Sequence, residues 1–294
     1  MKIHGLSIFI LFHFLIVSDS INAQDNSNDD SSPKRSYFKL GVNYINDNVY
    51  LGRKDSVKVP YLTPSIGYYS KSGFYITGSF SYLPSSGETR IDVFNLEAGY
   101  DFTIKKLEGE IYINKDFYNA KSFSVKSELS ANATANFGYD IGFIKPSLGG
   151  SINFGSTNDY ALTGGLNHSF SLNDDKLSIS PAINFNASTQ NYYNSYYQKR
   201  KYANSRKGKN GGYDITAIAL NVNNFKIMDY ELSVPFEYTV NKLTLNFTPT
   251  YAIPTNPNQV VLDVKSSNGG SYTQTFTEKL ANTFFWSFEI SFKF

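Results

Sequence analysis

The chain has no cysteine among its 294 residues, which excludes disulfides, thiolate metal sites and lipid attachment to an N-terminal cysteine. It has one Trp and three His, and only 18% of its residues are charged. A formal net charge of +2 is too weak to indicate a polyanionic partner, so nucleic-acid binding is not expected. The sequence has no Gly-rich phosphate loop, metal-spaced His cluster or nucleophile triad. We therefore expect no cofactor and no metal.

The first residues are typical of an export signal. Lys2 precedes an apolar run from Leu6 to Val17, and small or polar residues follow up to Ala23. A membrane-spanning helix needs roughly 20 apolar residues, so the short run favours a cleaved signal over a retained anchor helix. We expect a signal peptide over 1–23. The segment 24–35, rich in Ser, Asp and Asn, is expected to be a flexible periplasmic lead-in and could form a partial plug.

Aromatic residues make up 16% of the chain, yet no later apolar run is long enough for a transmembrane helix. From Ser36 onward, apolar and polar residues alternate with a period of two, most clearly in 176–188, 243–251 and 284–294. Such alternation predicts β-strands with one apolar and one polar face. The predicted strands are 37–46, 59–70, 73–83, 90–104, 107–114, 122–138, 142–154, 159–172, 176–189, 228–240, 242–253 and 279–294.

Short and long connections alternate along the predicted strands. Links such as Lys71-Ser72 and Lys105-Lys106 are tight, whereas 47–58, 190–227 and 254–278 are long. Short turns at one end and long loops at the other are typical of membrane β-barrels, which have an even number of strands. Because 213–226 would be a thirteenth strand, we predict that it extends the following strand outside the membrane. Prolines 60, 64, 146, 181, 235 and 249 fall inside predicted strands, and bulges or strand ends are expected at several of them.

Alternation alone does not decide which face meets lipid, because a soluble barrel or sandwich would turn the same apolar residues inward. Twelve strands enclose more space than side chains fill easily, so a small polar inner face around water fits better. The predicted fold is all-β, a transmembrane antiparallel up-and-down β-barrel of about 12 strands over 36–294.

The end of the chain resembles a known class. Residues Asn282–Phe294 form an alternating aromatic strand that finishes in Phe. This resembles the C-terminal signature of Gram-negative outer-membrane β-barrel proteins. The resemblance implies an outer-membrane location after export, contact with outer-membrane lipid and lipopolysaccharide, and recognition of Phe284–Phe294 by the barrel-assembly machinery.

Charged residues fall on the predicted inner face, and these are the lumen-lining candidates: Lys39, Glu97, Asp101, Glu108, Glu110, Lys126, Glu128, Lys145, Glu231, Glu237 and Glu289. Acids exceed bases, which predicts a weak cation preference if the lumen is open. The alternative is that cross-strand salt bridges fill a narrow, closed lumen. A two-carboxylate hydrolase built on Glu108 and Glu110 is not expected, because such pairs are common on these walls.

The loop 190–212 combines tyrosines with cations and has no acid. Its surface-binding candidates are Tyr192, Tyr193, Tyr196, Tyr197, Lys199, Arg200, Lys201, Arg206 and Lys207. Aromatic rings with cations suit sugars or phosphate-bearing glycolipid. The alternative is a solvated loop whose charge meets lipopolysaccharide phosphates.

His168 is the one histidine beyond the predicted signal, and its position predicts an outward-facing residue of the interfacial girdle, not a catalytic base. We expect no enzyme activity. The leading expectation is a small porin-like channel for ions or small solutes. The alternative is a closed barrel that acts as a platform for surface binding or adhesion through its long loops.

Overall fold

The structure is a computed structural model, and it describes residues 35–54, 58–84, 89–119, 122, 129–196, 213–266 and 269–294. Twelve antiparallel strands form a closed barrel. They are β1 (Tyr37–Ile45), β4 (Tyr61–Tyr69), β5 (Phe74–Leu83), β6 (Arg90–Ile104), β7 (Leu107–Tyr118), β8 (Leu129–Tyr139), β9 (Lys145–Gly155), β10 with β11 (Asp159–Asn167, Phe170–Leu172), β12 with β13 (Leu177–Ile179, Ala182–Ser188), β15 with β16 (Lys226–Ser233, Phe236–Val240), β17 (Leu243–Pro254) and β20 (Thr283–Lys293). The predicted fold class is confirmed.

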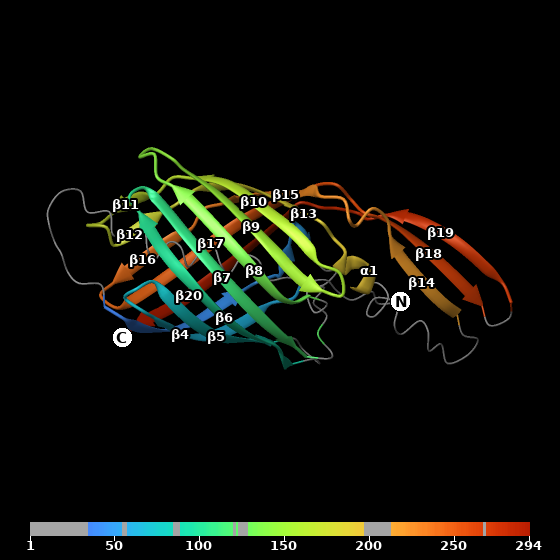
Figure 1. Cartoon of the computed structure of the whole chain (residues 1–294), viewed down its shortest axis with the longest axis horizontal. Helices are drawn as coiled ribbons and strands as arrows, with labels where there is room; N and C mark the ends of the chain where they lie inside the picture. The colour runs from blue at the N-terminus through green and yellow to red at the C-terminus, as the bar shows by residue number, and fades with distance from the viewer. Residues whose placement is uncertain are drawn as a thin grey trace.

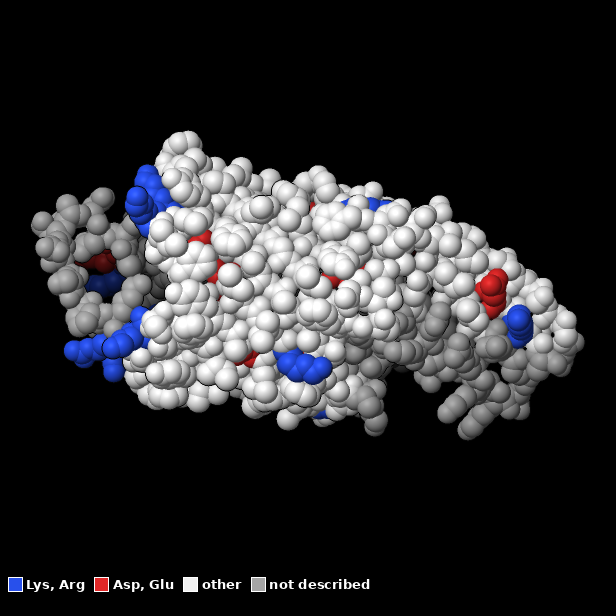
Figure 2. Space-filling model, viewed as in Figure 1, with Lys and Arg blue, Asp and Glu red and all other residues white. Residues whose placement is uncertain are grey.

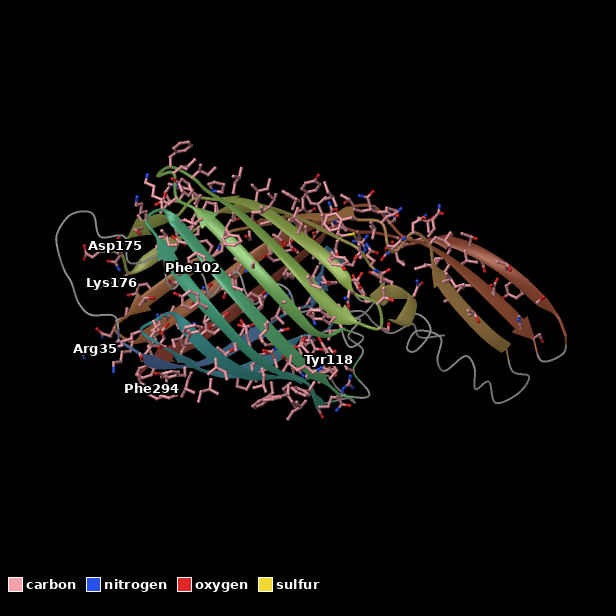
Figure 3. All side chains as sticks on the ribbon, viewed as in Figure 1. Arg35, Phe102, Tyr118, Asp175, Lys176 and Phe294 are labelled. Atoms are coloured by element: carbon pink, nitrogen blue, oxygen red, sulfur yellow. The ribbon has the colours of Figure 1, made fainter. Side chains whose placement is uncertain are left out.

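The barrel closes where its first and last strands pair, β1 against β20. Phe38 and Phe294 exchange backbone hydrogen bonds of 3.0 Å at this seam. Short links 70–73, 105–106, 140–144, 173–176 and 241–242 lie at one end, which we call the turn end. The longer connections follow Ile45, Leu83, Tyr118, Gly155, Ser188 and Pro254, and these strand ends lie at the opposite loop end (Figure 1). Figure 3 places Phe294 at the turn end and Tyr118 at the loop end.

The apolar face of each strand points out of the barrel. In β20, Phe284, Ile290 and Phe292 are exposed, whereas Ser287 and Ser291 are buried. A soluble protein reverses this arrangement, because water drives apolar side chains inward. Figure 2 shows a barrel wall composed almost entirely of uncharged residues, with Lys and Arg gathered at the turn end. Within the described residues, no helix is long and apolar enough to cross a membrane.

Four of the six in-strand prolines coincide with irregularities. Pro60 precedes β4, Pro181 and Pro235 lie in the breaks that divide their strands, and the β4–β5 ladder skips Pro64. Proline has no backbone N–H to donate, so the ladder is weakened there. Pro146 is the second residue of β9 and lies at its start, whereas β17 continues unbroken through Pro249. At Pro249 the neighbouring strand is interrupted instead, since the β15/β16 break faces this stretch.

A second sheet lies beyond the loop end of the barrel. It has the order β14 (Tyr213–Ala219), β18 (Gln259–Ser266), β19 (Ser271–Thr277). Figure 1 shows its three strands extending past the barrel mouth. Segment 213–226 is therefore not a spanning strand, as predicted. The prediction that it extends β15 is wrong. A turn over 220–225 separates β14 from β15, and β14 finds its partner in the long connection between β17 and β20.

Candidate functional site

Residues paired across neighbouring strands form rows around the inner wall, because side chains alternate between the two faces of each strand. One row runs through Tyr37, Tyr69, Tyr75, Gly99 and Tyr112 on five adjacent strands. Tyr37 and Tyr69 stack with ring centroids 5.0 Å apart, and Tyr69 and Tyr75 stack at 5.6 Å. We call these four tyrosines the tyrosine row. It gives one sector of the inner wall a nearly continuous aromatic surface.

Gly99 makes the close packing of this row feasible. A Cβ at Gly99 would lie 2.5 Å from the Tyr75 ring, so the ring occupies the space that any side chain at 99 would need. The Tyr75 hydroxyl reaches across β6 and donates to Glu110 Oε1 at 2.9 Å. The ring is therefore held flat along the wall.

Carboxylates border the tyrosine row on both sides. Asp101 of β6 and Glu110 of β7 lie directly opposite one another in the row toward the turn end. Glu97 lies in the next row toward the loop end and is paired with Asn114. Asn136 also donates to Glu110, at 3.1 Å. Like charges directly opposite in a sheet are destabilising, so this wall favours a positive charge beside it.

The predicted lumen-lining residues are distributed along this wall. Glu97, Glu110, Glu231 and Glu237 are buried, and Asp101 is partly buried. Two ion pairs join the others: Lys39 with Glu289 at 3.4 Å, and Lys145 with Glu108 across Gly138. Lys126 and Glu128 lie outside the described residues. Both the charged wall and some of the salt bridges expected from the sequence are therefore present.

Acids outnumber bases on the described inner wall. The acids also include residues that the sequence analysis did not select, Asp92, Asp116 and Asp229, all buried. Asp116 accepts from Asn95 at 2.7 Å, and Asp229 accepts from Asn186 at 2.9 Å. Neutral donors thus hold Asp116 and Asp229 in place without cancelling their charge, whereas Asp92 pairs with Arg90 Nε at 2.8 Å.

An apolar cluster lies over the loop-end mouth, and we call it the cap. It joins the small hairpin β2–β3 (Val49–Tyr50, Arg53–Lys54), the helix α1 (Tyr192–Tyr196), β14 and the first residues of β8, β15 and β18. Its members are Tyr50, Leu51, Leu129, Tyr192, Tyr193, Ala217, Ala219, Val222, Met228 and Val260. These residues come from loops at several separate points of the rim. Their burial together means that described side chains bridge the mouth.

The turn of the β2–β3 hairpin is fitted closely against the rim. Leu51 and Gly52 both have positive φ, 48° and 70°, as expected for a two-residue hairpin turn. A Cβ on Gly52 would lie 2.8 Å from the Asp229 Cβ and 2.9 Å from the Pro254 Cβ. Gly52 is therefore needed for its backbone conformation and for the close approach.

Substituting Gly52 with alanine is expected to loosen the cap. The positive φ alone costs on the order of 1 kcal/mol for a residue with a side chain, and the contacts with Asp229 and Pro254 add to it. Gly269→Ala is the matched control, because Gly269 also has a positive φ, of 88°, with nothing within 4 Å of its added Cβ. Hydrogen exchange at the Tyr193 amide should accelerate in Gly52→Ala well beyond the control. Equal rates in the two variants would contradict the proposed close fit.

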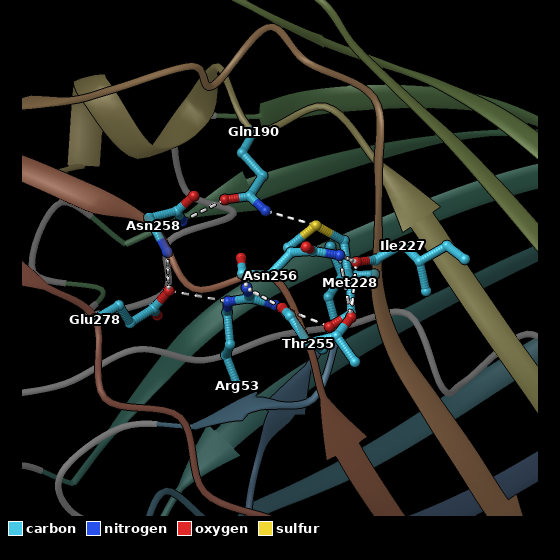
Figure 4. Close-up of polar contacts among 9 residues, drawn as sticks. Arg53, Gln190, Ile227, Met228, Thr255, Asn256, Asn258 and Glu278 are labelled. Atoms are coloured by element: carbon cyan, nitrogen blue, oxygen red, sulfur yellow. Dashed lines mark hydrogen bonds and ion pairs between the residues drawn. The ribbon is translucent and has the colours of Figure 1, made fainter.

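Arg53 fastens the hairpin to the barrel (Figure 4). Its guanidinium donates to the carbonyl oxygens of Leu51, Met228, Thr255 and Asn256 at 2.9 to 3.3 Å. Its Nε also pairs with Glu278 Oε2 at 3.2 Å. The side chain is buried, so these bonds replace its hydration. A single cation thus joins the β1–β4 and β17–β20 connections to the first residues of strand β15.

The carboxyl of Asp47, at the base of the hairpin, supports the same loop. It accepts a hydrogen bond from the Val59 amide at 3.1 Å and lies 3.8 Å from Lys54 Nζ. Burial raises the pKa of Asp47, and the hydrogen bond and the Lys54 charge only partly oppose this. Asn46-Asp47-Asn48 is therefore a structural bend.

Helix α1 is anchored by a carboxylate at its N-terminus. Asp159 accepts from the backbone amides of Asn191 and Tyr192 at 2.6 and 3.0 Å, and from the Thr189 hydroxyl. The helix then buries Tyr192 and Tyr193 in the cap, with exposures of 2% and 1%. Their prediction as exposed binding residues is wrong, because their apolar rings complete the cluster. The side chain of Tyr196 and all of Tyr197, Lys199, Arg200, Lys201, Arg206 and Lys207 lie outside the described part of the chain.

His168 lies in the break between β10 and β11. Its ring packs edge-on against Phe170 with centroids 4.3 Å apart. Glu108 and Glu110 have separate partners, Lys145 for the first and Tyr75 with Asn136 for the second. Within the described ranges, no group of three or more His, Asp or Glu could hold a metal ion.

The tyrosine row and Arg53 were not among the residues predicted from the sequence. The alternation that places Glu97 and Glu110 on the inner face also places Tyr75 and Tyr112 there, so the row could have been found. No local pattern marks Arg53, because its carbonyl partners at Met228, Thr255 and Asn256 are 175, 202 and 203 residues away.

No protein-family model matches the chain, and no curated protein matches it. Solved barrels resemble it only distantly. The NanC porin is 8% identical over 87% of this chain and 98% of its own, with a TM-score of 0.44. A bacterial polysaccharide outer-membrane secretin is 9% identical over 89% and 99%, with a TM-score of 0.40. OmpF of Salmonella typhi is 8% identical over 88% and 97%, with a TM-score of 0.33. At these values the neighbours carry no argument about function.

Proposed function

We propose that the chain is an outer-membrane channel for small cations and small polar solutes, with the cap closing its loop-end mouth. The observation that carries the proposal is the excess of carboxylates on the inner wall of a barrel whose outer face is apolar. Fixed charge of one sign on a pore wall selects ions of the opposite sign.

The apolar outer face and the polar inner face of the barrel also support an outer-membrane location. An apolar exterior of this extent is stable only against lipid, and a closed sheet leaves no backbone group unpaired in hydrocarbon. We place the loop end outside the cell and the turn end in the periplasm, since outer-membrane barrels have long outer loops and short periplasmic turns. Contacts of the basic segment 199–207 with lipopolysaccharide, and of Phe284–Phe294 with the assembly machinery, are part of this proposal.

Reconstitution in planar bilayers tests the channel. Under a KCl gradient, the reversal potential should have the sign of cation preference. Combining Glu97→Gln with Asp101→Asn should move that potential toward zero, because it removes two carboxylates from the wall. Asp263→Asn, in the sheet beyond the barrel, should leave it unchanged, since Asp263 bonds to the exposed Thr273 hydroxyl there. Anion preference in the wild type would refute the proposed selectivity.

A second candidate is a closed barrel that serves as a platform for surface binding. The cap favours it, because buried side chains bridge the mouth. The sheet β14–β18–β19 would then present the binding surface beyond the barrel. Absence of conductance steps, both in the wild type and after the cap is released, would select this candidate over the channel.

A further inference from the structure

We propose that the outer edge of β19 pairs with the same edge of a second copy of this chain, and that the pair joins barrels in two facing membranes. The inference goes beyond the channel, because it requires neither an open lumen nor conductance. It gives the surface-binding candidate a partner, and it rests on that candidate's use of the sheet β14–β18–β19 as the binding surface. Three features carry it: an unprotected edge, a symmetric strand sequence and the outward direction of the strands.

The edge of β19 that faces away from β18 has no partner strand among the described residues. Backbone bonds at the two ends of the β18–β19 ladder show which groups this edge presents. The Ser266 amide donates to the Gly270 carbonyl, and the Glu278 amide donates to the Asn258 carbonyl. Because bonded and non-bonded pairs alternate in an antiparallel ladder, the even-numbered residues of β19 direct their backbone groups toward β18. The backbone groups that point to the free edge are therefore those of Ser271, Thr273, Thr275 and Thr277.

The β19 edge also lacks the features that usually protect a sheet edge. Native edges are guarded by Lys, Pro, a bulge or a covering segment, because unpaired backbone groups recruit another strand. Strand β19 reads Ser-Tyr-Thr-Gln-Thr-Phe-Thr, with no charged residue and no Pro, and its register with β18 is unbroken. The opposite edge of the sheet differs, since α1 covers the end of β14, where the Ala219 amide donates to Asn194 Oδ1 at 2.9 Å. Strand β19 therefore presents an edge that a further extended strand can join.

The sequence of β19 is symmetric by residue type about Gln274, and this symmetry selects a second copy as the partner. In an antiparallel pair of two β19 strands centred there, Tyr272 lies opposite Phe276 of the second copy. Thr273 lies opposite Thr275, and both direct their backbone groups to the shared edge, so they form a hydrogen-bonded pair. Aromatic pairs and Thr–Thr pairs stabilise antiparallel sheets, and an uncharged edge meets its copy without repulsion. Tyr272 is 59% exposed and is thus available for this contact.

The direction of the strands decides which membranes the pair would join. Strands β18 and β19 run away from the barrel mouth (Figure 1). The residue after β19, Glu278, bonds to Arg53 at the rim, so Thr277 lies at the base of the sheet and Ser271 at its tip. Antiparallel pairing places the tip of one β19 against the base of the other. The two barrels therefore lie at opposite ends of the pair, each in a membrane of its own.

Clustering of vesicles that carry the full chain tests the pairing. Wild-type protein in phosphatidylcholine vesicles should cluster them, as measured by dynamic light scattering, whereas protein-free vesicles should stay separate. Thr275→Pro removes an N–H from the free edge but no bond to β18, so it should abolish clustering while the sheet persists. Thr275→Val is the matched control, because it keeps the N–H and should still cluster. Clustering by Thr275→Pro at the wild-type rate would overturn the pairing.

Gln274 tests the register, because it would lie opposite its own copy at the centre of the pair. Gln274→Lys and Gln274→Glu each place like charges directly opposite, so vesicles with either variant alone should not cluster. Mixing the two vesicle populations should restore clustering, since opposite charges then face one another. Failure of the mixture to cluster would overturn the pairing.

Hydrogen exchange and conductance separate the remaining outcomes. In detergent, the Thr273 and Thr275 amides of the monomer should exchange rapidly, and slow exchange there would overturn the pairing because another segment would cover the edge. Absence of wild-type clustering would overturn it as well, whatever the conductance. Clustering without conductance would refute the channel and support the pairing.

Discussion

Replacing Arg53 with alanine is expected to open the loop end of the barrel and to raise its single-channel conductance. The guanidinium bonds the β2–β3 hairpin to the Met228, Thr255 and Asn256 carbonyls and to the Glu278 carboxylate. Alanine removes every one of these bonds and leaves the Glu278 charge without its partner. The hairpin then loses these polar bonds and is held by the packing of Tyr50 and Leu51 in the cap, while the barrel ladders remain intact.

The expected size of the effect of Arg53→Ala follows from the burial of the Arg53–Glu278 ion pair. Removing one partner of a buried ion pair costs about 3–5 kcal/mol. Because the cap can open without unfolding the barrel, this cost should appear in the cap equilibrium and hardly at all in global stability. A change of about 3 kcal/mol raises the open population by roughly a hundredfold. Planar-bilayer recordings should show longer open times or larger steps, and limited proteolysis should cleave the loop 46–60 faster.

Two other variants make the test specific. Lys54 is next to Arg53 but largely exposed, and its contact with Asp47 is 3.8 Å long, so Lys54→Ala should behave like the wild type. Arg53→Lys keeps the charge but loses the planar fork, so it should give an intermediate phenotype. If Arg53→Ala conducted and resisted protease as the wild type does, the cap would not be held by this residue.

The barrel itself could be predicted from the sequence because its physical cause is local. In β17 and β20, every second residue is apolar, and the structure exposes Phe247 and Phe288 while it buries Thr248 and Ser287. Because the polarity of each residue indicates which face of the strand it lies on, the alternation predicts the strands directly. The even count and the alternation of short and long links then fix the order of the strands.

The cap and the second sheet could not be predicted in the same way. Segment 213–219 has strand-forming residues, but nothing in it specifies a partner, and it pairs with β18 instead of extending β15. Tyr192 and Tyr193 lie in a stretch rich in cations, which suggested exposure, and the apolar residues that bury them are distant in sequence. Long-range pairing, and not residue type, decides these positions.

Placing arginine at the outward position 113 should destabilise the barrel in lipid by about 2–4 kcal/mol, the cost of Arg near the bilayer midplane on a barrel's lipid face. Ile113 is 63% exposed in the middle of β7, and it is paired with two alanines, Ala98 and Ala133. Its surroundings therefore offer no acidic partner in the sheet. Urea titration of folding into phosphatidylcholine vesicles measures the change in the free energy of unfolding.

The same substitution at two other exposed isoleucines provides a depth series. Ile104 ends β6 at the turn end, where Arg reaches the interface, so Ile104→Arg should cost only about 0–1 kcal/mol. Ile218 is 41% exposed in β14, beyond the barrel, and Ile218→Arg should be nearly neutral. A water-soluble barrel would tolerate arginine equally at all three positions, since each side chain is exposed. A loss of stability that depends on depth in this way therefore indicates hydrocarbon around the strands. Equal tolerance of arginine at the three positions would contradict a membrane location.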